Sequence, residues 1–241
     1  MEYGLQLFSV RDITKDNLDG ALRQVAEMGY KNVEFAGFFG YSAEEVKAML
    51  DKYGLKVSGT HTGWQEVAEH FEETVAYHKT IGNKNIIVPG CDLSSQEKID
   101  AFVAMANEFQ PKLAAEGISF GYHNHAHEFR PNEDGSMIHD QLVYRTNLDL
   151  EIDTFWAYVG MKNPVALMER LKDRLKVIHI KDGFEDGKGK PLGMGTAPVA
   201  DVYAKAVEMG IPMVVESETL TPDGVTEAKI CIDYLKSLEK K

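Results

Sequence analysis

Apolar and polar positions follow a regular pattern along this chain. Short apolar runs alternate with longer stretches in which apolar residues recur every three or four positions, as Leu18, Leu22 and Val25 do. The first pattern is typical of buried strands, and the second of helices that pack on one face. The predicted strands are 4–9, 32–37, 56–62, 85–89, 118–125, 148–153, 176–181 and 212–216. The predicted helices are 17–28, 42–53, 65–81, 94–116, 137–144, 164–172, 199–209 and 223–238.

Local signals at the helix ends support these boundaries. Ser42 followed by Glu45 predicts a capping box, and Ser94 is the expected N-cap of the helix that reaches residue 116. Gly29 and Gly54 directly follow predicted helices, where glycine readily takes the left-handed conformation that ends a helix.

The predicted strands and helices alternate eight times, with a spacing of about 30 residues. Such alternation predicts parallel strands joined by right-handed crossovers. Within 241 residues this is typical of an α/β fold with a single (β/α)8 barrel, the TIM barrel, spanning residues 1–241. An open doubly wound sheet is the alternative. That fold usually carries a glycine-rich phosphate loop after its first strand, and the stretch LFSVRD contains no glycine.

Composition narrows the class of protein. The formal net charge is -12 and the pI is about 5.1, which disfavours a nucleic-acid partner because such binders neutralise phosphate with basic patches. The two cysteines form no CxxC motif, which favours a reduced compartment. The stretch MEYGLQLFSV resembles no signal peptide, and no window has the roughly 20 apolar residues of a membrane span. We therefore expect a cytoplasmic protein that acts without a membrane.

The stretch 118–129, ISFGYHNHAHEF, begins as a buried strand and ends in ionisable residues. On a strand His123 and His125 point to the same face, while His127 and Glu128 follow where the strand should end. Burying these groups together costs free energy unless a partner compensates for it. A metal ion or a polar substrate would be such a partner, so we expect a functional site here. A hydrogen-bonded histidine cluster at a strand end is the alternative.

Other predicted strands also end in polar residues, at the rim where a barrel enzyme places its active site. Histidines and carboxylates on neighbouring strands form a mixed donor set that suits Mn, Co, Zn or Mg. Taken singly, Asp153 could cap the next segment, His179 could be a core histidine and Glu216 could pair with a lysine. Glu151 shares a face with Asp153 and is expected one layer deeper. The strand-end residues are Gln6, Ser9, Arg11, Glu34, His61, His123, His125, Glu128, Glu151, Asp153, His179, Lys181, Asp182, Glu216 and Glu218.

Two features beside these strand ends fit a sugar substrate. Lys181 could hold a substrate oxygen, with an ion pair to Asp182 or Glu216 as the alternative. Trp156 and Tyr158 could form an apolar wall against a sugar ring, although packing at the barrel lip would explain them as well.

The motifs YHNHAHEF, LEIDTFW, VIHIKDG and VVESE, in this order, resemble the sugar phosphate isomerase/epimerase family, the xylose isomerase-like TIM barrels. The resemblance covers essentially the whole chain and is strongest to a YHNH-type branch related to inosose dehydratase and 3-keto-sugar enzymes. It implies a divalent metal held by Asp153, His179 and Glu216. The family's remaining ligand is a glutamate on the fifth strand, where this chain has His123. The fourth ligand is therefore either His123 or Glu128.

The resemblance also implies chemistry next to a carbonyl group of a sugar or keto-sugar. A base would remove the neighbouring proton, and an enediolate would form. Return of the proton gives an isomerase or epimerase, whereas loss of the β-oxygen gives a lyase or dehydratase. Glu216 fits one acid or base role, and His123, His125 or Glu128 would take the other. His61 and Lys181 are the candidates for orienting substrate oxygens.

The sequence is compatible with other classes of function. A phosphodiesterase of the endonuclease IV type shares this barrel, but the acidic charge argues against a DNA partner. A non-catalytic sugar-binding barrel is a further alternative. A phosphorylated substrate would need an anion site, for which the stretch 193–196 (GMGT) before a helix is a candidate; we favour an unphosphorylated sugar. Barrel enzymes often associate, so a homo-oligomer is also open.

Overall fold

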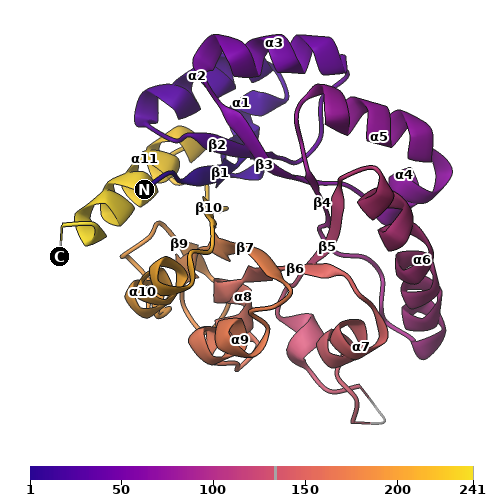
Figure 1. The fold of residues 1–241 in the computed structure, drawn as a ribbon. Helices are drawn as coiled ribbons and strands as arrows, with labels where there is room; N and C mark the ends of the chain where they lie inside the picture. The colour runs from indigo at the N-terminus through magenta and orange to yellow at the C-terminus, as the bar shows by residue number, and fades with distance from the viewer. Residues whose placement is uncertain (133–134, 241) are drawn as a thin grey trace.

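The computed structural model describes residues 1–132 and 135–240, and within them eight parallel strands close into a barrel (Figure 1). Each strand pairs with the next along the chain, and the last, β10, pairs with β1 to complete the ring. The predicted (β/α)8 barrel is confirmed, and the open doubly wound sheet is excluded. The strands are β1 Gly4–Gln6, β2 Asn32–Phe35, β3 Lys56–His61, β4 Asn85–Val88, β5 Ser119–His123, β6 Asp149–Asp153, β7 Leu175–Ile180 and β10 Met213–Val215.

Helices cover the outside of the barrel (Figure 1). No helix in the described ranges is long and apolar enough to cross a membrane. The helices are α1 Arg11–Thr14, α2 Leu18–Met28, α3 Ala43–Tyr53, α4 Trp64–Glu69, α5 Phe71–Thr80, α6 Gln96–Ala115, α7 Ile138–Arg145, α8 Thr154–Val159, α9 Pro164–Arg170, α10 Val199–Met209 and α11 Gly224–Leu238. Two 3-10 helices, η1 Leu7–Val10 and η2 His127–Phe129, and a hairpin of β8 Asp182–Gly183 with β9 Gly189–Lys190 complete the described elements.

Local sequence signals explain both ends of α3. The capping box of α3 is present: the Ser42 hydroxyl accepts the Glu45 N–H at 3.2 Å, and the Glu45 carboxylate accepts the Ser42 N–H at 2.8 Å. The helix ends at Gly54, whose φ of 65° lies in the left-handed region. This part of the prediction is confirmed.

Two helix predictions are wrong in detail. The predicted helix 65–81 is interrupted at His70, whose φ of -130° and ψ of 43° are not helical, so it forms α4 and α5. The long helix α6 is capped by Ser95, whose hydroxyl accepts a backbone N–H of the first turn. Ser94, the predicted cap, instead donates its N–H to the Asp92 carboxylate at 3.1 Å.

The C-terminal rim of the barrel carries short elements that the apolar pattern did not predict. The predicted strand 4–9 ends at Gln6, because the Gln6 side-chain oxygen accepts the Phe8 N–H at 3.0 Å and turns the chain into η1. Helix α8 follows β6 directly, where Asp153 accepts the Trp156 N–H at 2.7 Å. In both places a side-chain oxygen accepts a backbone N–H, and hydrophobic periodicity does not reveal such contacts.

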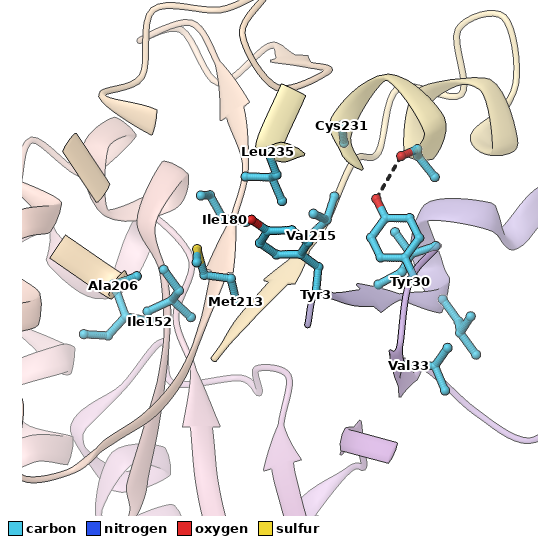
Figure 2. Packing of buried hydrophobic residues seen from close by; sticks show 14 of the residues in the cluster. Tyr3, Tyr30, Val33, Ile152, Ile180, Ala206, Met213, Val215, Cys231 and Leu235 are labelled. Atoms are coloured by element: carbon cyan, nitrogen blue, oxygen red, sulfur yellow. Dashed lines mark hydrogen bonds between the residues drawn. The ribbon is translucent and has the colours of Figure 1, made fainter. Parts of the chain in front are cut away.

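The main core lies between the strands and the surrounding helices. Figure 2 shows Val215 of β10 beside Leu235 of α11, and Val33 of β2 belongs to the same cluster; all three are fully buried. Burial of one such side chain stabilises the fold by about 1.5–3 kcal/mol. The Tyr30 hydroxyl in the same region donates to the Ala228 carbonyl oxygen at 2.8 Å, so its burial leaves no polar group unpaired.

The inside of the barrel holds a small, separate apolar cluster of Ile87, Val177 and Val214. Val177 precedes His179 by two residues on β7, so both side chains point to the same face of the strand. The polar side chains at the barrel mouth therefore lie one layer above this apolar plug, which forms a floor for a site that opens at the C-terminal rim.

Candidate active site

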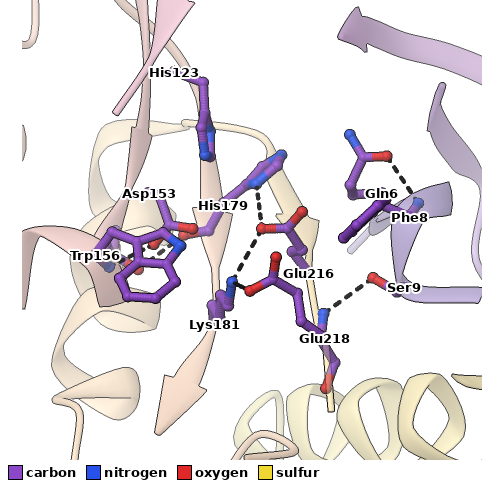
Figure 3. Close-up of polar contacts among 12 residues, drawn as sticks. Gln6, Phe8, Ser9, His123, Asp153, Trp156, His179, Lys181, Glu216 and Glu218 are labelled. Atoms are coloured by element: carbon purple, nitrogen blue, oxygen red, sulfur yellow. Dashed lines mark hydrogen bonds and ion pairs between the residues drawn. The ribbon is translucent and has the colours of Figure 1, made fainter. Parts of the chain in front are cut away.

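Ionisable side chains fill the C-terminal mouth of the barrel (Figure 3). They come from strands that are far apart in the sequence, and the parallel topology brings their carboxyl ends together. His61 is slightly accessible, and the other members of the group are buried. The buried members are Gln6, Glu34, His123, Glu151, Asp153, His179, Lys181 and Glu216.

An upper set of donors consists of His123, Asp153, His179 and Glu216. Each residue offers one donor atom, and the four atoms lie within 4.8 Å of one another. Two buried atoms in this set, Asp153 Oδ2 and His179 Nδ1, have no hydrogen-bond partner. Buried polar atoms without a partner are costly, so this arrangement points to a group that binds there.

Strand register explains why the upper set converges. Asp153 and His179 are direct partners in the pairing of β6 with β7. Glu216 follows β10, the other neighbour of β7, and its N–H donates to the Ile180 carbonyl oxygen at 3.4 Å. His123 ends β5, the strand on the far side of β6. Four consecutive strands of the ring thus each present one donor.

A lower set lies beneath it and consists of Glu34, Glu151 and His61, with Gln6 beside them. His61 Nε2 lies 2.7 Å from Glu151 Oε2 and 3.1 Å from Glu34 Oε1. Gln6 donates to Glu34 Oε1 at 2.6 Å. The expectation that Glu151 lies one layer deeper than Asp153 agrees with these contacts. His61, a candidate for orienting substrate, uses Nε2 to bridge two buried carboxylates.

The charge of the site favours a cation. Burial and the neighbouring Glu151 raise the pKa of Glu34 to about 7, and burial raises the pKa of Asp153 to about 7. Burial also lowers the pKa of His123 to about 3, so this imidazole is neutral at pH 7 and has a lone pair to offer. A neutral histidine among crowded carboxylates has the chemistry of a divalent-metal site.

Lys181 closes one side of the site. Its ammonium lies 3.3 Å from Glu216 Oε2, forms an ion pair with the Glu218 carboxylate and lies 4.8 Å from the centre of the Trp156 ring (Figure 3). Burial alone would lower the pKa of Lys181, but the nearby carboxylates outweigh it and hold this pKa above its ordinary value. Lys181 is therefore a cation at pH 7, and of the ion pairs considered as the alternative to a substrate contact, the one with Glu216 is present.

A pocket of about 400 Å³ opens above these side chains. His125 lies in its wall, with its ring centre 5.0 Å from that of His123, and burial lowers the pKa of His125. A pocket of this size is large enough to hold a small sugar molecule. Its lining residues are Phe8, Ala36, His61, Pro89, His123, His125, Glu216 and Glu218.

Comparison with known proteins identifies the family of this barrel. A sequence model described as xylose isomerase-like TIM barrel matches residues 22–238. The chain belongs to this family. The xylose isomerase-like barrel covers nearly the whole chain, so the resemblance drawn from the short motifs is confirmed at the level of the family.

Three similar proteins illustrate the range of this family. An inosose dehydratase from Geobacillus kaustophilus is 23% identical, and the match covers 91% of this chain and 87% of the relative. A 2-oxo-tetronate isomerase from Haemophilus influenzae is 27% identical, over 68% of this chain and 75% of the relative. A crystal structure of a sugar phosphate isomerase/epimerase from Parabacteroides distasonis has a TM-score of 0.85 and 26% identity, and the match covers 97% of this chain and 96% of that one.

Within this xylose isomerase-like barrel, the two candidates for the fourth metal ligand lie in different places. His123 belongs to the upper set, whereas Glu128 groups with His125 and His127. Glu128 is fully buried and accepts bonds from the Tyr122 hydroxyl at 2.9 Å and from the His125 N–H at 2.9 Å. These bonds stabilise the turn after β5, and Glu128 does not line the described part of the pocket.

The candidate anion site at 193–196 is wrong. The backbone N–H groups of Gly193 and Gly195 donate to Asp182 Oδ2 at 2.9 and 3.0 Å. Asp182 thus already occupies the donors that a phosphate would need. The carboxylate fixes the loop that follows the β8–β9 hairpin, and no signal in the GMGT motif distinguishes this use from phosphate binding.

The sequence marks some members of the site only as strand-end residues. Gln6 donates to Glu34, Glu34 contacts His179, and Glu218 pairs with Lys181. Their positions at the ends of β1, β2 and β10 are visible in the sequence. Which imidazole or ammonium each one contacts depends on barrel closure, because these partners are on other strands.

Proposed function

We propose that the chain is a divalent-metal-dependent isomerase or epimerase of a sugar or keto-sugar, acting by proton abstraction next to a carbonyl through an enediolate. The observation that carries this proposal is the upper set, in which four donors converge and two buried atoms lack partners. Family membership supports it, because relatives include proteins named as isomerases, epimerases and dehydratases.

The residues that would hold the metal are His123, Asp153, His179 and Glu216, a mixed nitrogen and oxygen set that suits Mn, Co, Zn or Mg. The chemistry that a divalent cation supplies at such a site is Lewis-acid polarisation of a carbonyl, which makes the neighbouring C–H bond more acidic.

Glu216 is our candidate for the base that takes this proton. Burial alone would raise the pKa of Glu216, but the charge of Lys181 outweighs it, together with that of His179 while this imidazole is protonated in the metal-free protein, and the pKa is held well below its ordinary value. The carboxylate is therefore ionised at neutral pH, and it lines the pocket. A base must be unprotonated and within reach of the substrate, and Glu216 meets both conditions.

His125 and Lys181 are the candidates for the remaining proton and charge transfers. His125 is a neutral imidazole in the pocket wall, so it can deliver or accept a proton. The Lys181 ammonium would stabilise negative charge on an enediolate oxygen. Of the other catalytic candidates, His61 lies at the pocket floor, and Glu128 supports the turn that carries His125.

Elimination is the second candidate reaction, and it would make the same site that of a lyase or dehydratase. The inosose dehydratase relative spans 91% of this chain, and His125 could protonate a departing hydroxyl group after proton removal by Glu216. Both reactions begin with the same proton abstraction and differ in the fate of the enediolate.

The first test is metal content by mass spectrometry, followed by a screen of neutral keto-sugars in deuterated water. We expect about one divalent metal per chain and metal-dependent exchange of the proton next to the carbonyl. NMR of the product then separates isomerisation and epimerisation from loss of water. Absence of bound metal under every loading condition would exclude this mechanism, and sugar binding without metal would indicate a non-catalytic binding barrel.

A further inference from the structure

The deepest polar contacts at the barrel mouth join carboxylates to imidazoles. Glu34 Oε1 lies 2.7 Å from His179 Nε2, and Glu151 Oε2 lies 3.1 Å from His123 Nδ1. All four side chains are at most 2% exposed. His179 Nε2 also lies 3.3 Å from Glu151 Oε2. Each imidazole of the upper set is therefore held from below by carboxylates of the lower set, with Glu34 the nearer one to His179.

These contacts involve different nitrogens of the two rings. His179 turns Nε2 toward Glu34, so its Nδ1 is left for a ligand. This Nδ1 has no hydrogen bond and lies 3.4 Å from Glu216 Oε2. His123 turns Nδ1 toward Glu151, which leaves Nε2 for a ligand. A carboxylate accepts the N–H of a neutral imidazole, and so it determines which nitrogen keeps a lone pair.

The carboxylates are themselves fixed in place. Gln6 donates to Glu34 at 2.6 Å, and the Gln6 side-chain oxygen in turn accepts the Phe8 N–H. His61 bridges Glu34 and Glu151 through one nitrogen. Glu151 is also the direct register partner of His123 between β6 and β5, so its distance from that ring is determined by the sheet.

We propose that Glu34 and Glu151 are positioning residues that dictate the ligand nitrogens of the metal site: Nδ1 for His179 and Nε2 for His123. This inference rests on the proposed function only in requiring that a divalent cation binds the upper set. In this role the carboxylates would hold the imidazole N–H groups, so that the opposite nitrogen of each ring is left to bind the metal.

The direct test uses the wild-type chain loaded with Zn²⁺ and labelled with ¹⁵N at histidine. Long-range ¹H–¹⁵N correlation identifies the protonated nitrogen of each ring. We expect His179 to carry its proton on Nε2 and His123 on Nδ1. A metal-bound His179 with its proton on Nδ1, or a chain that binds no Zn²⁺, overturns the inference.

A variant series tests the role of the carboxylates. Glu34→Gln removes the charge at nearly constant size, and Glu72→Gln on the exposed surface of α5 is the matched control. We expect the affinity for Zn²⁺, measured by chelator competition, to fall by about 10- to 100-fold in Glu34→Gln and to stay within twofold in the control. Wild-type affinity and an unchanged histidine spectrum in Glu34→Gln would contradict the inference.

Glu151→Gln provides the second variant if Glu34→Gln does not fold, and it should perturb the His123 signals more than the His179 signals. The test of the ligand nitrogens and the test of the proposed reaction can give opposite results. Correct ligand nitrogens without any reaction on keto-sugars would leave this inference intact and exclude the proposed reaction. Metal-dependent proton exchange with the opposite nitrogens bound would do the reverse.

Discussion

His179 Nε2 lies 2.7 Å from the carboxylate of Glu34, a residue 145 positions earlier in the chain. The barrel makes this contact possible because β7 and β2 present their ends to the same mouth. His179 thus has one nitrogen held by a carboxylate and the other left without a hydrogen bond beside Asp153 and Glu216. This arrangement is the one that metal-binding histidines use, and it supports the proposed role of His179 as a metal ligand.

The two carboxylate oxygens of Asp153 have different surroundings: one caps α8, and the other has no hydrogen-bond partner. Substitutions at Asp153 can therefore distinguish an effect on metal binding from an effect on fold stability. Asp153→Asn should keep the cap, since asparagine is an equally good N-cap. It should weaken metal binding by at least about tenfold, which corresponds to about 1.4 kcal/mol of binding free energy. Asp153→Ala should also lose about 1 kcal/mol of unfolding free energy. Urea unfolding of the metal-free proteins and chelator competition measure the two effects. Unchanged metal affinity in both variants would exclude Asp153 as a ligand.

Comparison of His123→Ala with Glu128→Gln tests the fourth ligand position. His123→Ala should lose metal, because this ring belongs to the upper set. Glu128→Gln should keep metal and lose about 1–3 kcal/mol of stability, since an amide cannot accept from both the Tyr122 hydroxyl and the His125 N–H. Metal content and thermal unfolding of both variants decide the matter, and the opposite pattern would assign the position to Glu128.

Removal of Lys181 should change the pH dependence of the reaction. Lys181 helps to hold the pKa of Glu216 below its ordinary value, so in Lys181→Gln this pKa rises. The base is then protonated over a wider acidic range, and the acidic limb of kcat/KM moves to higher pH. We also expect kcat/KM at its optimum to fall about 100-fold. Lys188→Gln, at an exposed site, is the control. A profile that keeps its acidic limb would rule out this role of Lys181.

His139 should make stability depend on pH at a place remote from the site. Burial lowers the pKa of His139 from an ordinary value of 6.5 to about 4, so between these pH values the unfolded chain binds the extra proton. Stability should therefore fall as the pH drops from 6.5 to 4, by up to about 3 kcal/mol from this group. The difference in unfolding free energy between wild type and His139→Leu, measured across this range, should show the slope. Parallel curves would exclude the contribution.

The sequence by itself determined the barrel and the rim. Apolar runs and helical periodicity placed the strands, because the burial of apolar area drives folding and has a period that can be read locally. Strand ends then located Asp153, His179 and Glu216 without coordinates, since in a parallel barrel every strand ends at the same mouth. The capping box of Ser42 and Glu45 was also visible, because both partners lie within one turn.

Only the tertiary structure decided the contacts between distant side chains. The choice of Glu34 as the partner of His179, the separation of His123 from Glu128, and the use of Asp182 to fix Gly193 all depend on closure and register. Hydrogen bonds are short and directional, so each of these contacts depends on which atoms the closed barrel brings together, and the local apolar pattern of a strand does not contain that information. The pattern of the chain therefore specifies where polar groups gather, and the closed barrel specifies which atom faces which.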